Sequence, residues 1–296
     1  MTLSARLDDP LAFPVLQTAL QPIVALEGER AVAFEALTRV HGGGMTVTEL
    51  FDGAAGRGRA VELNLIAVHA ALGATPRIPD DALLFVNADP AVLASSELPW
   101  LIRDGAARTS FPLSRLVVEV TERSAFTDVN AATRVLDELR ESGIRFALDD
   151  FGSAHSHLTL IDVICPSFIK ISHDFGMAFE QSTTRTRIVR HLTALAHDFE
   201  CSTILEGVES AATADAARAL GIEFAQGYHF GRPIPSVRPV GRAPCDRGRE
   251  TSRTGRRAVR HAGDDRGPPA TSLSTSVFFP ALSGLDPRQP KSRREK

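Results

Sequence analysis

The sequence predicts an α/β barrel of about eight strands, followed by a tail that has no core of its own. Short apolar runs alternate with amphipathic segments up to about residue 237, and this alternation favours a largely parallel sheet. About eight such runs occur, which is the strand count of a closed barrel. A chain of 296 residues with 43% hydrophobic content is long enough to bury one core of this size.

The first two expected strands form a hairpin. Leu20–Leu26 and Ala31–Val40 are separated by the turn Glu27-Gly28-Glu29-Arg30, so we expect them to run antiparallel. The other strands are short, rich in β-forming residues and bounded by turn residues: Leu83–Asn87, Leu116–Thr121, Arg145–Leu148, Phe168–Ile171, Ser202–Leu205 and Glu223–Gln226. Helices are expected between them from apolar spacing, a proline start and glycine ends: Thr48–Ala55, Ala60–Leu72, Pro90–Ala94, Asp128–Ser142, Thr184–Phe199 and Ala211–Leu220.

Composition divides the chain into a lead-in over residues 1–19, a domain over 20–237 and an Arg/Pro/Gly-rich tail over 238–296. From Gly241 onward there are 13 basic and 6 acidic residues, whereas the rest of the chain has 20 basic and 30 acidic ones. The tail has too few apolar residues to repay the entropy of ordering, so we expect it to be disordered. A solvated tail is the main expectation; nucleic acid is not expected as a partner except through this basic segment.

Nothing in the sequence predicts export or a membrane span. No run approaches eighteen apolar residues, and the N-terminus lacks a basic stretch followed by an apolar one. The three cysteines, Cys165, Cys201 and Cys245, are widely spaced and form no C-x-x-C pair, which indicates neither a disulfide framework nor a zinc site. We therefore expect a cytoplasmic protein.

Polar residues end most of the expected strands. Parallel strands of a barrel converge at their carboxyl ends, where catalytic residues lie, and five carboxylates on one rim require cations. No histidine ends a strand, so the oxygen-rich set favours Mg²⁺ or Mn²⁺ over zinc. Several carboxylates suit a two-metal site that activates water and stabilises the leaving oxygen of a phosphodiester. The polar residues are Glu35, Asn87, Glu119, Asp149 with Asp150, Lys170, Glu206 and Gln226.

The pair of adjacent acids also has a purely structural interpretation, whereas the lysine favours a functional one. Adjacent acids such as Asp149 and Asp150 are commonly a capping pair at a strand-to-helix turn. Lys170 favours a functional site instead, because the chain has only three lysines and the others are Lys291 and Lys296. In a chain so biased to arginine, a lysine indicates a need for a compact ammonium on a flexible stem.

A series of motifs between Leu20 and Pro235 carries a more specific signal. In order they are Gln21-Pro22-Ile23-Val24, Glu35-Ala36-Leu37-Thr38-Arg39, Asn87, Glu119-Val120-Thr121-Glu122, Asp149-Asp150-Phe151-Gly152, Lys170-Ile171, Glu206-Gly207-Val208-Glu209 and Gln226-Gly227-Tyr228. This ensemble resembles the EAL domain, the family of bacterial cyclic di-GMP phosphodiesterases. The resemblance implies a modified (β/α)8 TIM-like barrel with an antiparallel first strand, in agreement with the expected hairpin. It also implies hydrolysis of cyclic di-GMP to linear pGpG, two Mg²⁺ or Mn²⁺ ions per site, and a homodimer.

The resemblance further implies a role for each matched residue. Glu35, Asn87, Glu119 and Asp149 would be ligands of one metal, and Asp149 would bridge to a second that Asp150 helps to hold. Glu206 would be the general base, and Lys170 would orient the attacking water. The remaining matches are substrate contacts at Gln21, Arg39 and Gln226, and supporting residues at Glu122 and Glu209.

The chain departs from the family pattern at two places. The family loop Asp-Phe-Gly-Thr-Gly-Tyr-Ser-Ser is replaced here by residues 150–157, where Ala154 and His155 differ most, and Ser172 stands where the family has an aspartate. Three hypotheses therefore remain: an active phosphodiesterase with reduced activity, a degenerate domain that binds cyclic di-GMP or a protein partner without turnover, and a barrel that abstracts a proton beside a Mg²⁺-bound enolate. The retained ligands and Glu206 favour the first.

Overall fold

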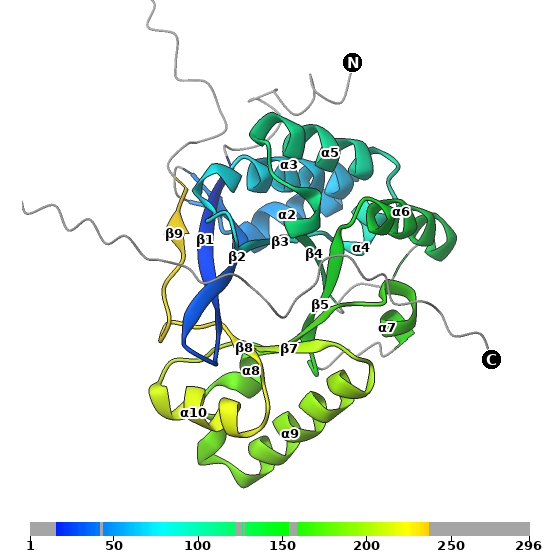
Figure 1. Ribbon diagram of the computed structural model, residues 1–296. Helices are drawn as coiled ribbons and strands as arrows, with labels where there is room; N and C mark the ends of the chain where they lie inside the picture. The colour runs from blue at the N-terminus through cyan, green and yellow to red at the C-terminus, as the bar shows by residue number, and fades with distance from the viewer. Residues whose placement is uncertain (1–15, 42–43, 122–125, 127, 154–158, 237–296) are drawn as a thin grey trace, which may run out of the picture.

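The computed structural model describes residues 16–41, 44–121, 126, 128–153 and 159–236 (Figure 1). Its sheet has the order β2-β3-β4-β5-β6-β7-β8-β1-β9, and pairing of β2 with β1 closes it into a barrel. Strand β1 runs antiparallel to β2 and β8, whereas β2 to β8 are mutually parallel. The predicted barrel with an antiparallel first strand is therefore confirmed. Its strands are β1 (Leu16–Ala25), β2 (Arg30–Val40), β3 (Leu83–Asn87), β4 (Leu116–Thr121), β5 (Arg145–Phe151), β6 (Phe168–Ile171), β7 (Ser202–Leu205), β8 (Phe224–Ala225) and β9 (Ile234–Pro235).

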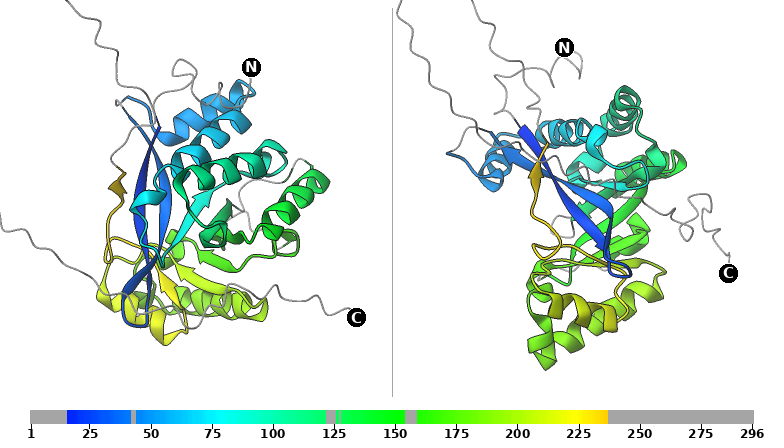
Figure 2. Two further views of the ribbon diagram at one scale, coloured as in Figure 1. Left: turned by 45° about the horizontal axis from the view of Figure 1, so that its top comes forward. Right: turned by 60° about the vertical axis from the view of Figure 1, so that its left-hand side comes forward.

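Helices pack around the barrel except on the side formed by β1 and β9 (Figures 1 and 2). They are α2 (Val47–Gly56), α3 (Ala60–Leu72), α4 (Pro90–Leu93), α5 (Glu97–Thr109), α6 (Val129–Glu141), α7 (Thr159–Ile164), α8 (His173–Gly176), α9 (Thr183–Asp198) and α10 (Ala211–Ala219). Local side chains begin several of them. At α2, Thr46 Oγ1 accepts a hydrogen bond from Glu49 N at 3.1 Å, and Glu49 Oε2 accepts one from Thr46 N at 2.7 Å, which satisfies two exposed backbone donors. Asp128 and Ser210 cap α6 and α10 in a similar way.

Alternate residues of the strands form two apolar layers, because successive side chains of a strand point to opposite faces. Outward residues such as Leu84, Val118, Phe146 and Leu148 pack under the helices. Inward residues fill the barrel with a layer to which every strand from β1 to β8 contributes: Ile23, Ala33, Leu83, Phe85, Val117, Ala147, Phe168, Ile204 and Phe224. Phe85 and Phe224 each pack edge-on against Phe168, with ring centroids 5.3 and 6.1 Å apart.

Several expected boundaries differ from the structure. Strand β1 begins at Leu16, inside the expected lead-in. Its first residues pair with the end of β2, where Leu16 lies opposite Val40. Helix α5 was not expected, since Pro99 and Gly105 lower its helix propensity. Pro99 lies in the first turn, and Gly105 packs closely on Leu72 of α3. The expected disordered tail over 238–296 lies outside the described residues.

Candidate active site

The polar residues singled out in the sequence lie one step above the inner apolar layer. Each follows an inward apolar residue of its strand by two positions and therefore points into the barrel as well. The apolar partners are Ala33, Phe85, Val117, Ala147, Phe168, Ile204 and Phe224. The polar residues above them are Glu35, Asn87, Glu119, Asp149, Lys170, Glu206 and Gln226. In antiparallel β1, Gln21 precedes inward Ile23 by two and pairs with Glu35 of β2.

The expectation that each polar residue ends its strand is wrong for several of them. Glu35 lies in the middle of β2, Glu119 lies two residues before the end of β4, and Glu206 follows β7. The strands of a barrel are tilted and staggered, so equal height above the core does not mean equal distance from the strand end. What these polar residues share is that each lies two residues after an inward apolar residue.

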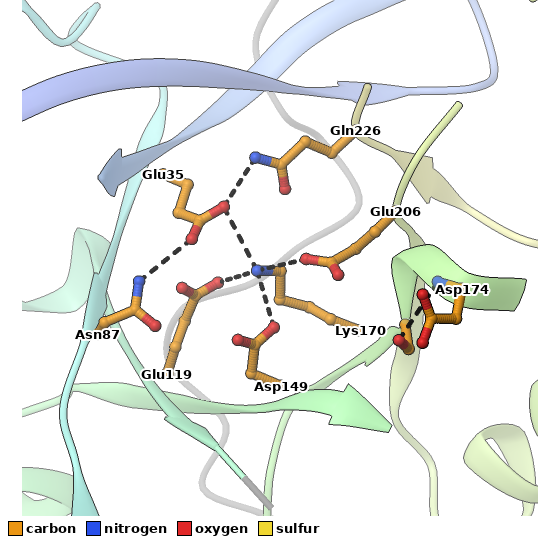
Figure 3. A network of polar contacts seen from close by, with 9 residues as sticks. Glu35, Asn87, Glu119, Asp149, Lys170, Asp174, Glu206 and Gln226 are labelled. Atoms are coloured by element: carbon orange, nitrogen blue, oxygen red, sulfur yellow. Dashed lines mark hydrogen bonds and ion pairs between the residues drawn. The ribbon is translucent and has the colours of Figure 1, made fainter. Parts of the chain in front are cut away.

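Lys170 stands at the centre of the site. Its Nζ lies 2.8 Å from Glu206 Oε1, 2.9 Å from Glu119 Oε1, 2.9 Å from Asp149 Oδ1 and 3.4 Å from Glu35 Oε2 (Figure 3). The side chains of Lys170 and Glu119 are almost completely buried. Four carboxylates, three from strands and one from the segment after β7, therefore share one ammonium in a site largely screened from water, where charge interactions are strong.

Two amides orient Glu35. Asn87 Nδ2 donates to Glu35 Oε1 at 3.1 Å, and Gln226 Nε2 donates to Glu35 Oε2 at 2.7 Å (Figure 3). Gln226 is buried, and its Oε1 has no hydrogen-bond partner among the described residues. Both oxygens of Glu35 are thus held in place, one by the last residue of β3 and the other by the residue that follows β8.

A β-bulge separates the two adjacent aspartates. The pairing of β5 with β6 shifts between Leu148 and Phe151, and Asp150 has a left-handed φ of 57°. The extra residue of a bulge re-aims the side chains around it. Asp149 thereby stays on the inward face beside Lys170, while Phe151 returns to the outer apolar layer. The pair is not a helix cap: no described helix begins at Asp149 or Asp150.

The clustering shifts the pKa values of its members. Burial disfavours the charged ammonium of Lys170, but the carboxylates of Asp149, Glu119, Glu206 and Glu35 outweigh this and raise its pKa well above the usual range. Burial, together with the charge of Glu35, raises the pKa of Glu119 well above that of an ordinary glutamate. Burial also raises the pKa of Glu206, to about 8; Lys170 opposes the rise and Asp149 adds to it. Although burial acts the other way on Glu35, Lys170 and the hydrogen bond from Gln226 lower its pKa.

The other predicted site residues lie around this cluster. Gln21 is buried and donates to the Gly231 carbonyl at 3.3 Å. Arg39 and Glu209 are exposed, and Arg39 Nη1 donates to Thr38 O at 2.9 Å. Ser172 is 2% exposed and caps α8 by accepting a hydrogen bond from Asp174 N at 3.4 Å. Glu122 and the loop residues 154–158, which include Ala154 and His155, lie outside the described residues.

The donor set fits hard divalent cations, although the carboxylates here face Lys170. Across the ranges that the structure describes, no three His, Cys, Asp or Glu side chains surround a common point closely enough to hold a metal ion. The chemistry of the set nevertheless fits Mg²⁺ or Mn²⁺, which prefer carboxylate and amide oxygens. Glu119 Oε2 is buried and lacks a hydrogen-bond partner within this part of the chain. One ammonium cannot neutralise all four carboxyl groups once they are ionised, and a further cation would favour their ionised form.

The fold and the site define a carboxylate-rich (β/α)8 barrel with a central lysine. The model of the EAL domain matches residues 8–233, and the chain belongs to the EAL-domain family. The chain is similar to the probable cyclic di-GMP phosphodiesterase PdeB of Escherichia coli, with 25% identity over 78% of this chain and 45% of PdeB. It is also similar to the bifunctional diguanylate cyclase/cyclic di-GMP phosphodiesterase MucR of Pseudomonas aeruginosa, with 30% identity over 51% of this chain and 22% of MucR.

Solved structures show the same barrel. The calcium and cyclic di-GMP complex of BlrP1 from Klebsiella pneumoniae has a TM-score of 0.67 and 28% identity, covering 75% of this chain and 56% of that one. A manganese and cyclic di-GMP complex of BlrP1 has the same TM-score, identity and coverage. The chain matches less than half of the length of each of the two curated relatives, PdeB and MucR. Within the part described here, no helix is both long and apolar enough to cross a membrane.

Sequence reasoning missed a group of glycines around Glu206. Gly176 and Gly227 make close backbone approaches to the segment that carries it, and Gly207, which lies in that segment, packs against the ring of His173. The signal was present in part, because Gly207 and Gly227 directly follow two of the predicted site residues. Gly176 had no such neighbour, and only the folded chain brings it near Glu206.

Proposed function

We propose that this chain hydrolyses cyclic di-GMP to linear pGpG with two Mg²⁺ or Mn²⁺ ions per site. The observation that carries the proposal is the convergence of Glu35, Asn87, Glu119, Asp149 and Glu206 around Lys170. This arrangement occurs in a barrel of the EAL-domain family. The relatives named as cyclic di-GMP phosphodiesterases supply the substrate class.

Glu206 is the proposed general base. A base works best when its pKa lies near the operating pH, and burial raises the pKa of Glu206 to about 8. In the reaction, the oxygen of water bonds to phosphorus and its proton passes to Glu206. The bond from phosphorus to the 3′ oxygen breaks, and that oxygen takes up a proton to leave a 3′-hydroxyl and a 5′-phosphate on the product.

Lys170 is proposed to hold the attacking water and to keep the carboxylates together. Its ammonium contacts Glu206 and Asp149 directly, so a water hydrogen-bonded to either carboxylate would lie close to a fixed positive charge. Such preorganised charge requires no rearrangement at the moment of reaction. A compact ammonium suits this crowded position better than a planar guanidinium would.

Glu35, Asn87, Glu119, Asp149 and Asp150 would hold the two metal ions. When bound, the ions would lower the pKa of water and stabilise charge on the leaving oxygen. Glu35, Glu119 and Asp149 would have to share with the ions oxygens that here face Lys170.

The proposed substrate contacts lie at the edge of this cluster. Gln21 pairs with Glu35 across the β1–β2 ladder, Arg39 lies four residues beyond Glu35 on the same strand face, and Gln226 contacts Glu35. The exposed guanidinium of Arg39 suits a phosphate because it can bind two oxygens at once. Glu122 and Glu209 stay in their predicted supporting role. The homodimer, the cytoplasmic location and any contact of the tail with nucleic acid also remain predictions.

One observation favours a second candidate function, a domain that binds cyclic di-GMP without turnover. Ser172 replaces an aspartate of the family pattern, and the structure uses its hydroxyl as a helix cap. A carboxylate is therefore missing near Lys170, which would weaken metal binding while leaving substrate contacts in place.

Hydrolysis of cyclic di-GMP followed by chromatography separates the two candidates. Purified protein with Mg²⁺ or Mn²⁺ is expected to convert cyclic di-GMP to pGpG, and excess EDTA is expected to abolish this. Ca²⁺ should inhibit, because it accepts looser and larger coordination than Mg²⁺. Binding of cyclic di-GMP without any pGpG would support the second candidate, and turnover in excess EDTA would rule out the metal-dependent mechanism.

A further inference from the structure

The segment that carries Glu206 is irregular but firmly held. Glu206–Val208 follow β7 and belong to no helix or strand. Glu206 N donates to Ile171 O at 3.1 Å, Val208 N donates to Gln226 O at 3.1 Å, and Val208 O accepts from His229 N at 3.1 Å. The backbone on both sides of Glu206 is thus anchored to the ends of β6 and β8.

Helix α8 closes over this segment through Gly176. A Cβ on Gly176 would lie 1.6 Å from the carbonyl oxygen of Glu206 and 2.8 Å from its carbonyl carbon. Separations this short do not occur in folded proteins, and the obstructing atoms are backbone rather than the tip of a flexible side chain. Only glycine permits so close an approach of two backbones. Helix α8 also begins three residues after Lys170, so one short stretch of chain supports both members of the Lys170–Glu206 pair.

His173 provides a second contact from the same helix. A Cβ on Gly207 would lie 2.5 Å from His173 Nδ1, so the imidazole ring packs on the peptide directly after Glu206. Gly207 has a φ of 71°, a conformation that glycine adopts without strain. On the other side, Gly227 approaches Val208, where a Cβ would meet Val208 O at 2.0 Å. The segment is therefore enclosed between α8 and the turn after β8.

We propose that Gly176 and His173 are positioning residues that hold the Glu206 carboxylate against Lys170 for proton transfer. The inference rests on the proposed hydrolysis, because it assigns Glu206 as the base. Relief of the clash in Gly176→Ala requires that α8 or the Glu206 carbonyl move by an ångström or more. A displacement of that size at a catalytic group costs about 100-fold in rate.

The test compares Gly176→Ala and His173→Ala with matched controls. Gly105→Ala introduces a methyl group at another buried helical glycine, where it would meet the side chain of Leu72, with Cδ1 at 2.6 Å and Cβ at 3.1 Å, and no backbone atom. His191→Ala removes an exposed histidine of α9. We expect Gly176→Ala to lower kcat by about 10- to 100-fold with KM nearly unchanged, His173→Ala to cause a smaller loss, and both controls to keep the wild-type kcat.

Two further measurements distinguish positioning from general damage to the fold. If both residues act through Glu206, neither substitution should lower the residual rate by more than about twofold in a Glu206→Gln background, because coupled residues are non-additive. Amide hydrogen exchange of the peptide containing residues 206–208 should be faster in Gly176→Ala and His173→Ala than in wild type and in the controls.

The outcomes separate this inference from the proposed function. A folded Gly176→Ala protein with wild-type kcat and exchange would overturn the inference, as would an equal fractional loss of rate in the Glu206→Gln background. If Gly176→Ala does not fold, His173→Ala decides by the same measurements. If the wild-type protein fails to hydrolyse cyclic di-GMP, the proposed function is wrong, and the exchange at residues 206–208 still decides whether α8 holds this segment.

Discussion

The ammonium of Lys170 lies 2.8 Å from the carboxylate of Glu206, the shortest of its four ion pairs. The two groups respond to the site in different ways. The surrounding carboxylates raise the pKa of Lys170 well above its usual range, so it stays charged at neutral pH. Burial brings the pKa of Glu206 to about 8, so a modest change in its surroundings can protonate or deprotonate its carboxyl group. The site thus pairs a fixed positive charge with a titratable carboxyl group.

The substitution Glu206→Gln should separate catalysis from binding. The amide keeps the size of the side chain but cannot accept a proton from water, so the rate should fall by about 10²- to 10⁴-fold, the usual contribution of a general base. Affinity for cyclic di-GMP, measured by calorimetry, should change little because Gln21 and Arg39 are untouched. Wild-type activity in Glu206→Gln would mean that another residue is the base.

The substitution Lys170→Met should destabilise the protein strongly. It leaves four buried carboxylates without their cation, and removal of one partner from a buried ion pair costs about 3–5 kcal/mol. The free energy of unfolding in urea measures this loss, which should be smaller near pH 5, where the carboxylates can take up protons. The control is Arg103→Met, which breaks a 2.7 Å pair with Glu138 between half-exposed side chains and should cost no more than about 1 kcal/mol. Equal losses in both variants would contradict the central role of Lys170.

The stability of the metal-free protein should fall as the pH rises from about 5 to about 8. Glu206 has a higher pKa in the folded protein than in the unfolded chain, so between these values the folded state binds more protons and stability decreases with pH. The raised pKa of Glu119 also makes stability decrease as the pH rises. The lowered pKa of Glu35 contributes stability that is lost only at more acidic pH. Unfolding temperatures measured in EDTA across this range test the sign.

The same measurement on Glu206→Gln isolates the contribution of that residue. At pH 8 the metal-free variant should unfold at a higher temperature than wild type, because it no longer has to ionise a buried carboxyl. Each 1 kcal/mol gained corresponds to about 2–4 °C for a domain of this size. At pH 5 the difference should shrink, and an equal difference at both values would show that ionisation of Glu206 is not the cause.

The substitution Ser172→Asp should lower the concentration of Mn²⁺ or Mg²⁺ needed for half-maximal rate. Ser172 follows Lys170 by two residues, directly after β6, and caps α8. Aspartate is an equally good cap, so the helix should be kept. The new carboxylate would add negative charge beside the more weakly held metal. A metal titration at saturating cyclic di-GMP compares the two proteins. A lower rate with an unchanged metal requirement would show that the serine is already accommodated.

The sequence could predict which polar residues gather inside the barrel, because the signal for each of them is local. Each polar residue follows a buried run, and the motifs from Gln21 to Tyr228 occur in one order along the chain. Strand periodicity alone then determines that Val117 and Glu119, or Phe168 and Lys170, face the same way. The hairpin of β1 and β2 was predictable for the same reason, since its turn lies within a few residues of both strands.

Only the tertiary structure decided how these residues meet. The height of Glu35, in mid-strand, relative to Glu206, beyond the end of β7, depends on barrel stagger, which no single strand encodes. The approach of Gly176 to the Glu206 carbonyl joins residues that are thirty positions apart, and no local pattern marks such a contact. Helix α5 shows the same limit, because Gly105 is unfavourable in an isolated helix but allows close packing on Leu72. Sequence patterns therefore determined which groups are present, whereas the closed sheet and its packing determined their distances and their pKa values.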